Sequence, residues 1–318
     1  MENQFLNPNL NFIRYPQFNA IQNQITRCRE LSKSSLEPQC MSLEGETGCG
    51  KSILLKDYAS RYPRQETEHG TIIPVFYAEF PSPTTVKSTV AALLEQLGDP
   101  GAGKGTVWAL NSRLVRLIKN RGVELVLMDE GSNIIESGTN HITYSISDWL
   151  KMFIKQTNIP VLIAGMENSV SRIINANPQL SRLFACRASL KPFYFNDEKS
   201  INSFSMFISF AEKAIEIPLT TDVQKFEMLS RIHYATDGYV GNIMNLLRNA
   251  GSYSKDRQGN CIELNDLSIA FEERLSKHVR TKVNPFATPC TEKFEIPENS
   301  DDSFLRINYT ISNTLSTK

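Results

Sequence analysis

Residues 45–52 of this chain read Gly45-Glu46-Thr47-Gly48-Cys49-Gly50-Lys51-Ser52, which satisfies the pattern G-x-x-x-x-G-K-[ST]. Glycines let consecutive backbone N–H groups turn inward around phosphate oxygens, and a helix that begins at Lys51 adds the positive end of its dipole. We expect Lys51 to neutralise the β- and γ-phosphates of a nucleotide, and Ser52 to offer its hydroxyl to Mg²⁺. An apolar strand at Cys40–Leu43 precedes the loop, as this mechanism requires. The stretch therefore predicts that residues 45–52 bind ATP·Mg²⁺.

A second apolar strand, Val123–Met128, ends in the acid pair Asp129-Glu130. A buried parallel strand delivers the residue at its end to the carboxyl edge of the sheet, beside the phosphate loop. We expect Asp129 to hold Mg²⁺ through water, and Glu130 to orient and deprotonate the attacking water. The acid pair therefore favours an ATP hydrolase, because a nucleotide switch can omit the second acid.

Strands and helices alternate through the N-terminal part of the chain. Apolar runs predict strands at 72–80 and 159–164, and helical spacing predicts helices at 83–97, 106–120 and 142–153. This alternation predicts a parallel sheet covered on both faces. Residues 196–282 have helical spacing throughout, and the polar, proline-containing residues 283–318 predict a tail without its own core. We therefore expect an α/β domain at 1–195, a helical domain at 196–282 and a tail at 283–318.

The composition is that of a neutral globular protein. The 318 residues include 34 Lys and Arg, 34 Asp and Glu, and 41% hydrophobic residues. No run approaches the roughly 20 uncharged apolar residues that a membrane span needs. The six cysteines lack paired or metal-type spacing, so we expect a cytoplasmic protein without membrane contact or a zinc site. The balanced charge argues against a surface that is basic everywhere, but not against one basic strip.

These features resemble an AAA+ ATPase, and more closely the TniB/TnsC family of transposition ATPases. The resemblance covers about residues 10–282. Besides the glycine loop, it is carried by PVFYAEFPSPTTVK (74–87), LLEQLGDPGAG (93–103), ELVLMDE (124–130), IPVLIAGMEN (159–168), PQLSRLF (178–184) and YATDGYVGNIMNLLRNA (234–250). It implies a P-loop AAA+ fold with a five-stranded parallel sheet flanked by helices, and a small C-terminal helical domain that forms a lid over the nucleotide.

The resemblance also implies roles for residues outside the loop. Asn168 matches the sensor of the γ-phosphate, although a helix N-cap is its simpler role. Arg182 matches the arginine that such ATPases project into a neighbouring subunit's site, where it stabilises charge on the departing γ-phosphate; Arg187 is the rival. The chain departs from the family pattern at Gly131-Ser132-Asn133, and it reads Gly241-Asn242 where many AAA+ proteins carry a second sensor arginine. We therefore expect hydrolysis to be slow without DNA or a partner.

For function, the resemblance implies an ATP-dependent ring or filament on duplex DNA. Such an assembly links a target selector of the TniQ/TnsD type to a DDE-type transposase, and some family members serve CRISPR-associated transposons. Contacts through Arg182 are heterologous, so they generate rings or open helices of this chain. The candidate DNA contacts are Lys87, Lys104, Lys151 and Arg172. Three alternatives stay open, namely a helicase-loader or initiator ATPase, a P-loop phosphotransferase acting on a small molecule, and an ATP-gated signalling switch.

Overall fold

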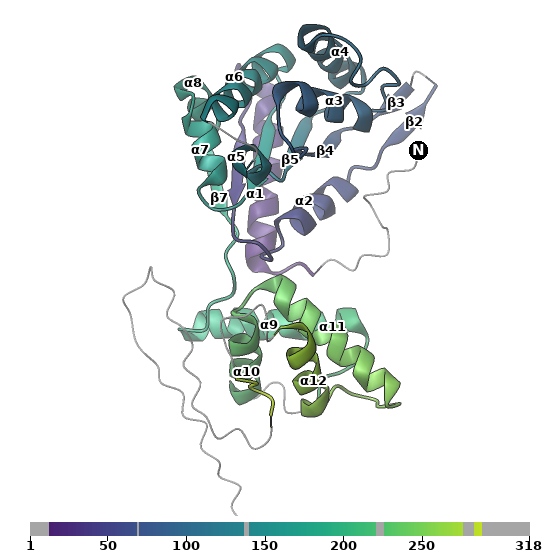
Figure 1. Cartoon of the computed structure of the whole chain (residues 1–318), viewed down its shortest axis with the longest axis vertical. Helices are drawn as coiled ribbons and strands as arrows, with labels where there is room; N and C mark the ends of the chain where they lie inside the picture. The colour runs from purple at the N-terminus through teal and green to yellow at the C-terminus, as the bar shows by residue number, and fades with distance from the viewer. Residues whose placement is uncertain (1–12, 69, 137–139, 221–225, 276–282, 288–318) are drawn as a thin grey trace, which may run out of the picture. The chain divides into compact units, whose positions relative to one another are not determined.

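The computed structural model describes residues 13–68, 70–136, 140–220, 226–275 and 283–287. They divide into an α/β unit of residues 17–191 and a helical unit that combines residues 13–16 with the chain from Pro192 onward. The boundary after Lys191 lies four residues before the one expected from the sequence. Figure 1 shows the α/β unit, with its labelled strands between layers of helices, and the helical unit.

Five parallel strands form the main sheet of the α/β unit. In their order across the sheet they are β4 (Val75–Glu79), β5 (Leu125–Asp129), β6 (Val161–Gly165), β1 (Met41–Glu44) and β7 (Cys186–Ser189). Every residue of β5 and β6 is buried. Continuous apolar strands are typical of parallel sheets, because helices cover both faces. The predicted P-loop AAA+ sheet is confirmed, and its order places β6 between the strand of the phosphate loop and the strand of the acid pair.

Helices pack on both faces of this sheet (Figure 1). One face forms a single hydrophobic core with α3 (Val86–Gln96), α4 (Val107–Asn120), α6 (Asn140–Thr157), α7 (Ser169–Asn175) and α8 (Pro178–Leu183). Strand residues Phe76, Met128 and Ile163 belong to that core. On the other face α2 (Lys51–Ser60) contacts β4, β5 and β6, and α1 (Pro16–Ser34) is bound to α2 by the buried Gln22–Asp57 hydrogen bond of 2.6 Å.

Local sequence signals explain where several of these elements begin and end. Thr85 and Ser88 form a capping box at the start of α3, and the Thr106 hydroxyl caps α4. The single strand expected at 72–80 is wrong, because the run is interrupted at Pro74. Residues before Pro74 form β3 (Gly70–Ile72), which pairs antiparallel with β2 (Gln65–Thr67) in a separate sheet. Proline lacks the N–H donor that a continuous central strand would need.

The helical unit contains α9 (Glu198–Ile215), α10 (Phe226–Thr236), α11 (Val240–Asp256) and α12 (Leu264–Arg274). An aromatic cluster joins both of its chain segments, because the Tyr15 ring lies 5.0 Å from that of Phe193 and 5.4 Å from that of Phe207. The helix α11 contacts each of the other three helices. Among the described helices of both units, none is long and apolar enough to cross a membrane.

The first residues of the expected tail pack on the helical unit. Phe286 is 1% exposed, and its ring lies 6.4 Å from that of Phe271. The Arg231 guanidinium donates to the carbonyl of Pro285 at 2.7 Å, and the Asn284 side-chain amide donates to the Ser268 carbonyl at 3.1 Å. Pro285 and Phe286 are therefore buried in this unit, at the start of the segment that the sequence predicts as a tail. Residues 288–318 lie outside the described residues.

Candidate nucleotide site

The phosphate loop joins β1 to α2 in a conformation that depends on its glycines. Gly48 and Gly50 have φ angles of 86° and 98°, in the left-handed region that side chains disfavour. Gly45 lies so close to the neighbouring backbone that an added Cβ would be 2.3 Å from the Leu190 carbonyl oxygen. These positions cannot hold larger residues without moving the loop. The glycine pattern is therefore a geometric requirement of this turn.

Lys51 and Ser52 occupy the first turn of α2, beside this loop. The Lys51 ammonium donates to the carbonyls of Gly45 at 2.7 Å and Glu46 at 3.0 Å, so it lies over the loop. Burial lowers the pKa of Lys51, and the negative charges of Asp129 and Glu130 act against that shift. The lysine is thus within electrostatic reach of the acid pair, although β6 separates their strands.

Cys49 contributes packing to the loop. Its side chain is fully buried, and its N–H donates to the Glu46 carbonyl at 3.3 Å, which closes a turn. Burial raises the pKa of the Cys49 thiol to about 11, so the group stays protonated and unreactive near neutral pH. Glu46, Thr47 and Gly48 are exposed at the rim of the loop.

Asp129 ends β5 with both carboxylate oxygens held by donors. Its Oδ1 accepts from the backbone N–H of Glu130 at 2.8 Å, and its Oδ2 lies 3.1 Å from the Tyr77 hydroxyl. The residue is only 1% exposed. A carboxylate that is fixed in this way presents a defined direction to a cation or to a water molecule bound to it.

Glu130 follows with a left-handed backbone, at φ 56°. Burial raises the pKa of its carboxyl, and the neighbouring charges of Asp129 and Glu79 raise it further. A raised pKa brings a carboxylate closer to the range useful for a general base. The next residue, Gly131, is buried against β6, and an added Cβ would lie 2.9 Å from the Ala164 carbonyl oxygen. The chain therefore requires glycine directly after the acid pair.

The two residues that follow Gly131 have a structural role in this chain. They belong to the short helix α5 (Ser132–Glu136). The Ser132 hydroxyl accepts from the N–H of Met166 at 2.8 Å, and the Asn133 amide donates to the Phe80 carbonyl at 2.9 Å. These bonds connect the ends of β4, β5 and β6. The departure from the family pattern at 131–133 thus supplies polar groups that hold the carboxyl edge of the sheet together.

Asn168 lies at the N-cap position of α7, but its side chain makes no cap hydrogen bond. It is exposed and has a left-handed φ of 62°. With Tyr144 and Arg172 it lines a groove between α6 and α7. The charge of its neighbour Glu167 acts on Cys49 of the phosphate loop, together with those of Lys51 and Glu46. The sensor role of Asn168 stays a prediction.

Arg182 and Arg187 differ in how firmly their own chain holds them. The Arg182 side chain is 70% exposed and pairs only with the exposed Glu37 among the described residues, at 2.6 Å. The Arg187 guanidinium donates to Asn175 at 3.1 Å and to Ser181 at 3.0 Å. Exposed ion pairs contribute about 0–1 kcal/mol, so Arg182 is the easier of the two to transfer to a partner. This difference favours Arg182 as the arginine that reaches a neighbouring subunit.

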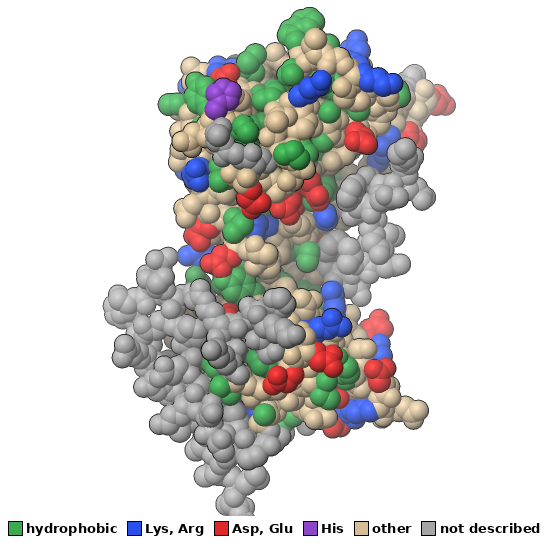
Figure 2. Space-filling model, in the orientation of Figure 1, with side chains coloured by type: hydrophobic (Ala, Val, Ile, Leu, Met, Phe, Trp, Pro, Cys, Tyr) green, Lys and Arg blue, Asp and Glu red, His purple; other side chains and the backbone are tan. Residues whose placement is uncertain are grey.

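The four candidate DNA contacts do not share one environment. Lys87 at the start of α3, Lys104 in the α3–α4 loop and Arg172 on α7 are exposed. Lys151 is only 19% exposed and pairs with Asp148 on its own helix, so it is the weakest of the four. Figure 2 shows Lys and Arg together with Asp and Glu on the visible face of the α/β unit. Any basic strip must therefore come from a few local charges.

Three polar residues that were not predicted from the sequence lie beside the acid pair. Tyr77 and Glu79 lie on β4, and Glu79 is in register with Asp129. Lys56, on α2, pairs with Glu79 at 3.4 Å. A signal was present in the sequence, because a tyrosine and a glutamate at alternate positions of a buried strand put polar groups on one face. Only the pairing of β4 with β5 shows that this face meets Asp129.

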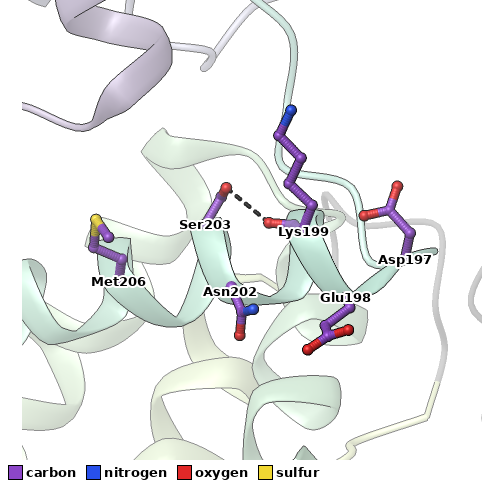
Figure 3. A pocket seen from close by; sticks show the side chains of 6 residues that line it. All are labelled: Asp197, Glu198, Lys199, Asn202, Ser203 and Met206. Atoms are coloured by element: carbon purple, nitrogen blue, oxygen red, sulfur yellow. Dashed lines mark hydrogen bonds between the residues drawn. The ribbon is translucent and has the colours of Figure 1, made fainter.

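The helical unit has a hollow of its own at the start of α9. Its lining side chains are drawn in Figure 3 and comprise Asp197, Glu198, Lys199, Asn202, Ser203 and Met206. Asp197 caps the helix by accepting from the N–H of Ser200 at 2.7 Å, and the Ser203 hydroxyl donates to the Lys199 carbonyl at 2.8 Å. Lys199 and Glu198 point to opposite sides of the helix (Figure 3). These contacts describe a capped helix start.

The residues at the carboxyl edge of the sheet fit ATP·Mg²⁺. The glycine loop supplies N–H groups at the start of α2, and Lys51 supplies a cation beside them. Asp129 and the Ser52 hydroxyl are the oxygen groups that would hold Mg²⁺, which prefers oxygen ligands. Glu130 adds a carboxylate with a raised pKa at the same edge.

Residues 7–193 match the family model described as "Bacterial TniB protein". The chain belongs to the TniB family. This assignment confirms the resemblance seen in the sequence, and TniB proteins are a transposition-associated family of AAA+ ATPases. No curated protein sequence matches this TniB-family chain.

Solved structures with the same fold include proteins from Aeropyrum pernix and Thermotoga maritima. Aeropyrum pernix ORC1 in complex with DNA has 17% identity and a TM-score of 0.59, covering 83% of this chain and 68% of that one. Aeropyrum pernix ORC2 with ADPNP and ADP has 13% identity and a TM-score of 0.60, covering 88% and 72%. The Thermotoga maritima RuvB Holliday junction branch migration motor has 13% identity and a TM-score of 0.51, covering 81% and 70%. At such identities the likeness establishes the fold alone.

Proposed function

We propose that this TniB-family chain is a cytoplasmic, Mg²⁺-dependent ATPase that assembles head to tail on duplex DNA. In this proposal the assembly links a target selector of the TniQ/TnsD type to a DDE-type transposase. The observation that carries the ATPase part is the sheet order, because the glycine loop follows β1 and the acid pair lies at the end of β5, with β6 between these parallel strands.

Each residue of this edge has a role in hydrolysis. Lys51 and the loop N–H groups hold the β- and γ-phosphates, while Ser52 and Asp129 hold Mg²⁺, which offsets charge on the transferred phosphoryl group. Glu130 takes a proton from water as the water oxygen bonds to the γ-phosphorus. The bond from the γ-phosphorus to the β–γ bridging oxygen breaks, and ADP and phosphate leave. Asn168 senses the γ-phosphate in this scheme.

Assembly brings an arginine of one subunit to the nucleotide site of its neighbour. Arg182 is exposed and weakly held, so it can enter a neighbour's site and stabilise charge on the γ-phosphate. A contact of this kind is heterologous and generates a ring or an open helix. Repetition aligns Lys87, Lys104 and Arg172 of successive subunits along a phosphate backbone. A chain with no net charge can then bind DNA through aligned local cations.

Electron microscopy with and without duplex DNA tests assembly most directly. We expect rings or filaments with ATP and duplex together, and none with duplex alone. Lys51→Ala is the matched control, because it removes the phosphate-binding cation and should abolish ATP binding in calorimetry while the melting temperature of the free protein stays unchanged. A chain that binds ATP but forms no assembly on duplex contradicts the proposal.

A second measurement separates the transposition role from the initiator alternative. We expect a cognate DDE transposase to change the ATPase rate of the DNA-bound assembly, and to be recruited to it in a pull-down. A helicase-loader or initiator would instead engage a helicase and leave the transposase unbound. A small-molecule phosphotransferase would transfer the γ-phosphate to an acceptor other than water, which product analysis detects.

A further inference from the structure

The Tyr77 hydroxyl bridges two in-register carboxylates on neighbouring strands. It lies 2.6 Å from Oε1 of Glu79 and 3.1 Å from Oδ2 of Asp129. Glu79 and Asp129 are partners in the β4–β5 register. Because parallel strands lie about 4.8 Å apart, two such acids repel each other unless a donor or a cation stands between them. Tyr77 is that donor.

The Tyr77 hydroxyl acts as a donor toward these acids, because a carboxylate oxygen can only accept. A phenol carries one proton, which the Tyr77 hydroxyl shares between Glu79 and Asp129 as a bifurcated donor. Lys56 neutralises part of the charge on Glu79 through the 3.4 Å ion pair, and its ammonium lies 5.3 Å from the centre of the Tyr77 ring. The helix that begins at the phosphate loop thus helps to hold this tyrosine.

Tyr77 also completes the restraint of Asp129. The N–H of Glu130 holds Oδ1, and a donor to Oδ2 gives the carboxylate a second point of restraint against rotation. The Tyr77 hydroxyl is the side-chain donor to Oδ2 among the described residues. Without it, the carboxylate rotates about its last bond and its lone pairs lose their direction. Groups that orient a metal-binding carboxylate typically contribute about 10- to 100-fold to metal affinity or activity.

We propose that Tyr77 is a positioning residue for Mg²⁺, acting through Asp129 from the neighbouring strand. This inference rests on the proposed ATP·Mg²⁺ site and adds a residue that the phosphate loop and the acid pair do not contain. Tyr77 does not touch the nucleotide in this scheme. Its effect therefore appears in the Mg²⁺ dependence of ATP binding and not in the intrinsic affinity for the metal-free nucleotide.

The test compares Tyr77→Phe with Tyr58→Phe in the full chain. Tyr58 is a buried tyrosine of the same unit whose hydroxyl contacts Thr26 at 3.2 Å, away from the acid pair. Thermal shift measurements at saturating ATP and increasing MgCl₂ give the half-saturating Mg²⁺ concentration. We expect Tyr77→Phe to raise that concentration about tenfold, with ATP affinity in EDTA unchanged, and Tyr58→Phe to leave both at the wild-type values.

A double variant shows whether the effect passes through Asp129. On an Asp129→Asn background, Tyr77→Phe should have no further effect on the Mg²⁺ dependence, because its acceptor has already lost its charge. Equal Mg²⁺ dependence in Tyr77→Phe and the wild type overturns the inference, and so does an undiminished effect of Tyr77→Phe on the Asp129→Asn background. A wild-type chain that binds no ATP overturns the proposed function itself. The two failures are thus distinguishable.

Discussion

The carboxylate of Glu44, at the end of β1, accepts hydrogen bonds from the N–H of Ser171 at 2.7 Å and from its hydroxyl at 3.0 Å. Ser171 lies in the first turn of α7, where backbone N–H groups lack partners within the helix. Asn168 occupies the N-cap position without capping, so a strand residue supplies the acceptor instead. Glu44 also immediately precedes the phosphate loop, so this contact joins the loop to the segment that carries Asn168.

Replacing Glu44 with alanine should destabilise the α/β unit. Loss of a helix cap lowers the free energy of unfolding by about 0.5–2 kcal/mol. Urea denaturation followed by circular dichroism measures this change. Glu95→Ala, an exposed glutamate on α3, is the matched control and should stay within about 0.5 kcal/mol of the wild type. Equal stability of the two variants would show that Glu44 contributes nothing to α7.

Glu130→Gln should bind ATP normally and hydrolyse it about 10²- to 10⁴-fold more slowly, because an amide cannot take a proton. The wild-type rate should also depend on pH. Glu130 works as a base only when ionised, and burial together with Asp129 and Glu79 raises its pKa. The rate should therefore fall on acidification at a higher pH than for an ordinary glutamate. Steady-state phosphate release across pH gives the profile, and a Glu130→Gln variant with wild-type turnover excludes this residue as the base.

Arg182→Ala should abolish most DNA-stimulated hydrolysis while leaving the fold intact, because its pairing with Glu37 is exposed. An arginine of this kind contributes about 10³- to 10⁵-fold to the rate. Mixing the Arg182→Ala and Glu130→Gln variants restores some composite sites. In these sites the Arg182→Ala subunit supplies an intact Glu130, and its Glu130→Gln neighbour supplies an intact Arg182. Random mixing at equal amounts should restore about a quarter of the interfaces in a head-to-tail assembly.

The control for that experiment is Arg187→Ala, which removes hydrogen bonds to Asn175 and Ser181 of its own chain. We expect this variant to have a lower melting temperature than the wild type, with little change in the hydrolysis rate per assembled subunit. If Arg182→Ala is fully active and Arg187→Ala is inactive, Arg187 is the arginine that acts in the neighbouring subunit's site. A mixture that stays inactive under assembling conditions argues against a shared site.

The start of the tail should behave as part of the helical unit. Phe286→Ala should lower the free energy of unfolding by about 3–5 kcal/mol, because it removes a buried aromatic ring packed on Phe271. A chain that ends after Ala287 should keep wild-type stability, ATP binding and DNA binding but lose transposition. Urea denaturation of both proteins checks the stability of each. A truncation after Ala287 that unfolds as readily as Phe286→Ala contradicts this division of the tail.

Much of the candidate site follows from short stretches of sequence. The spacing of Gly45, Gly50 and Lys51 predicts a phosphate loop, because the turn, the helix start and the lysine are all set by neighbouring residues. Asp129 could be placed at the end of its strand for the same reason. The break at Pro74 is also visible in the sequence, because proline lacks the N–H donor of a central strand, although apolar residues continue on both sides of it.

By itself, the sequence determined the loop, the acid pair, the alternation of strands and helices, and the family. These features depend on contacts between residues a few positions apart, which local chemistry fixes. Only the tertiary structure decided that Tyr77 contacts Asp129, 52 residues away, and that Glu44 caps the helix of Ser171, 127 residues away. Such pairs depend on strand order and register, which are set by the packing of whole helices on the sheet. No local pattern specifies which polar side chains this packing brings together.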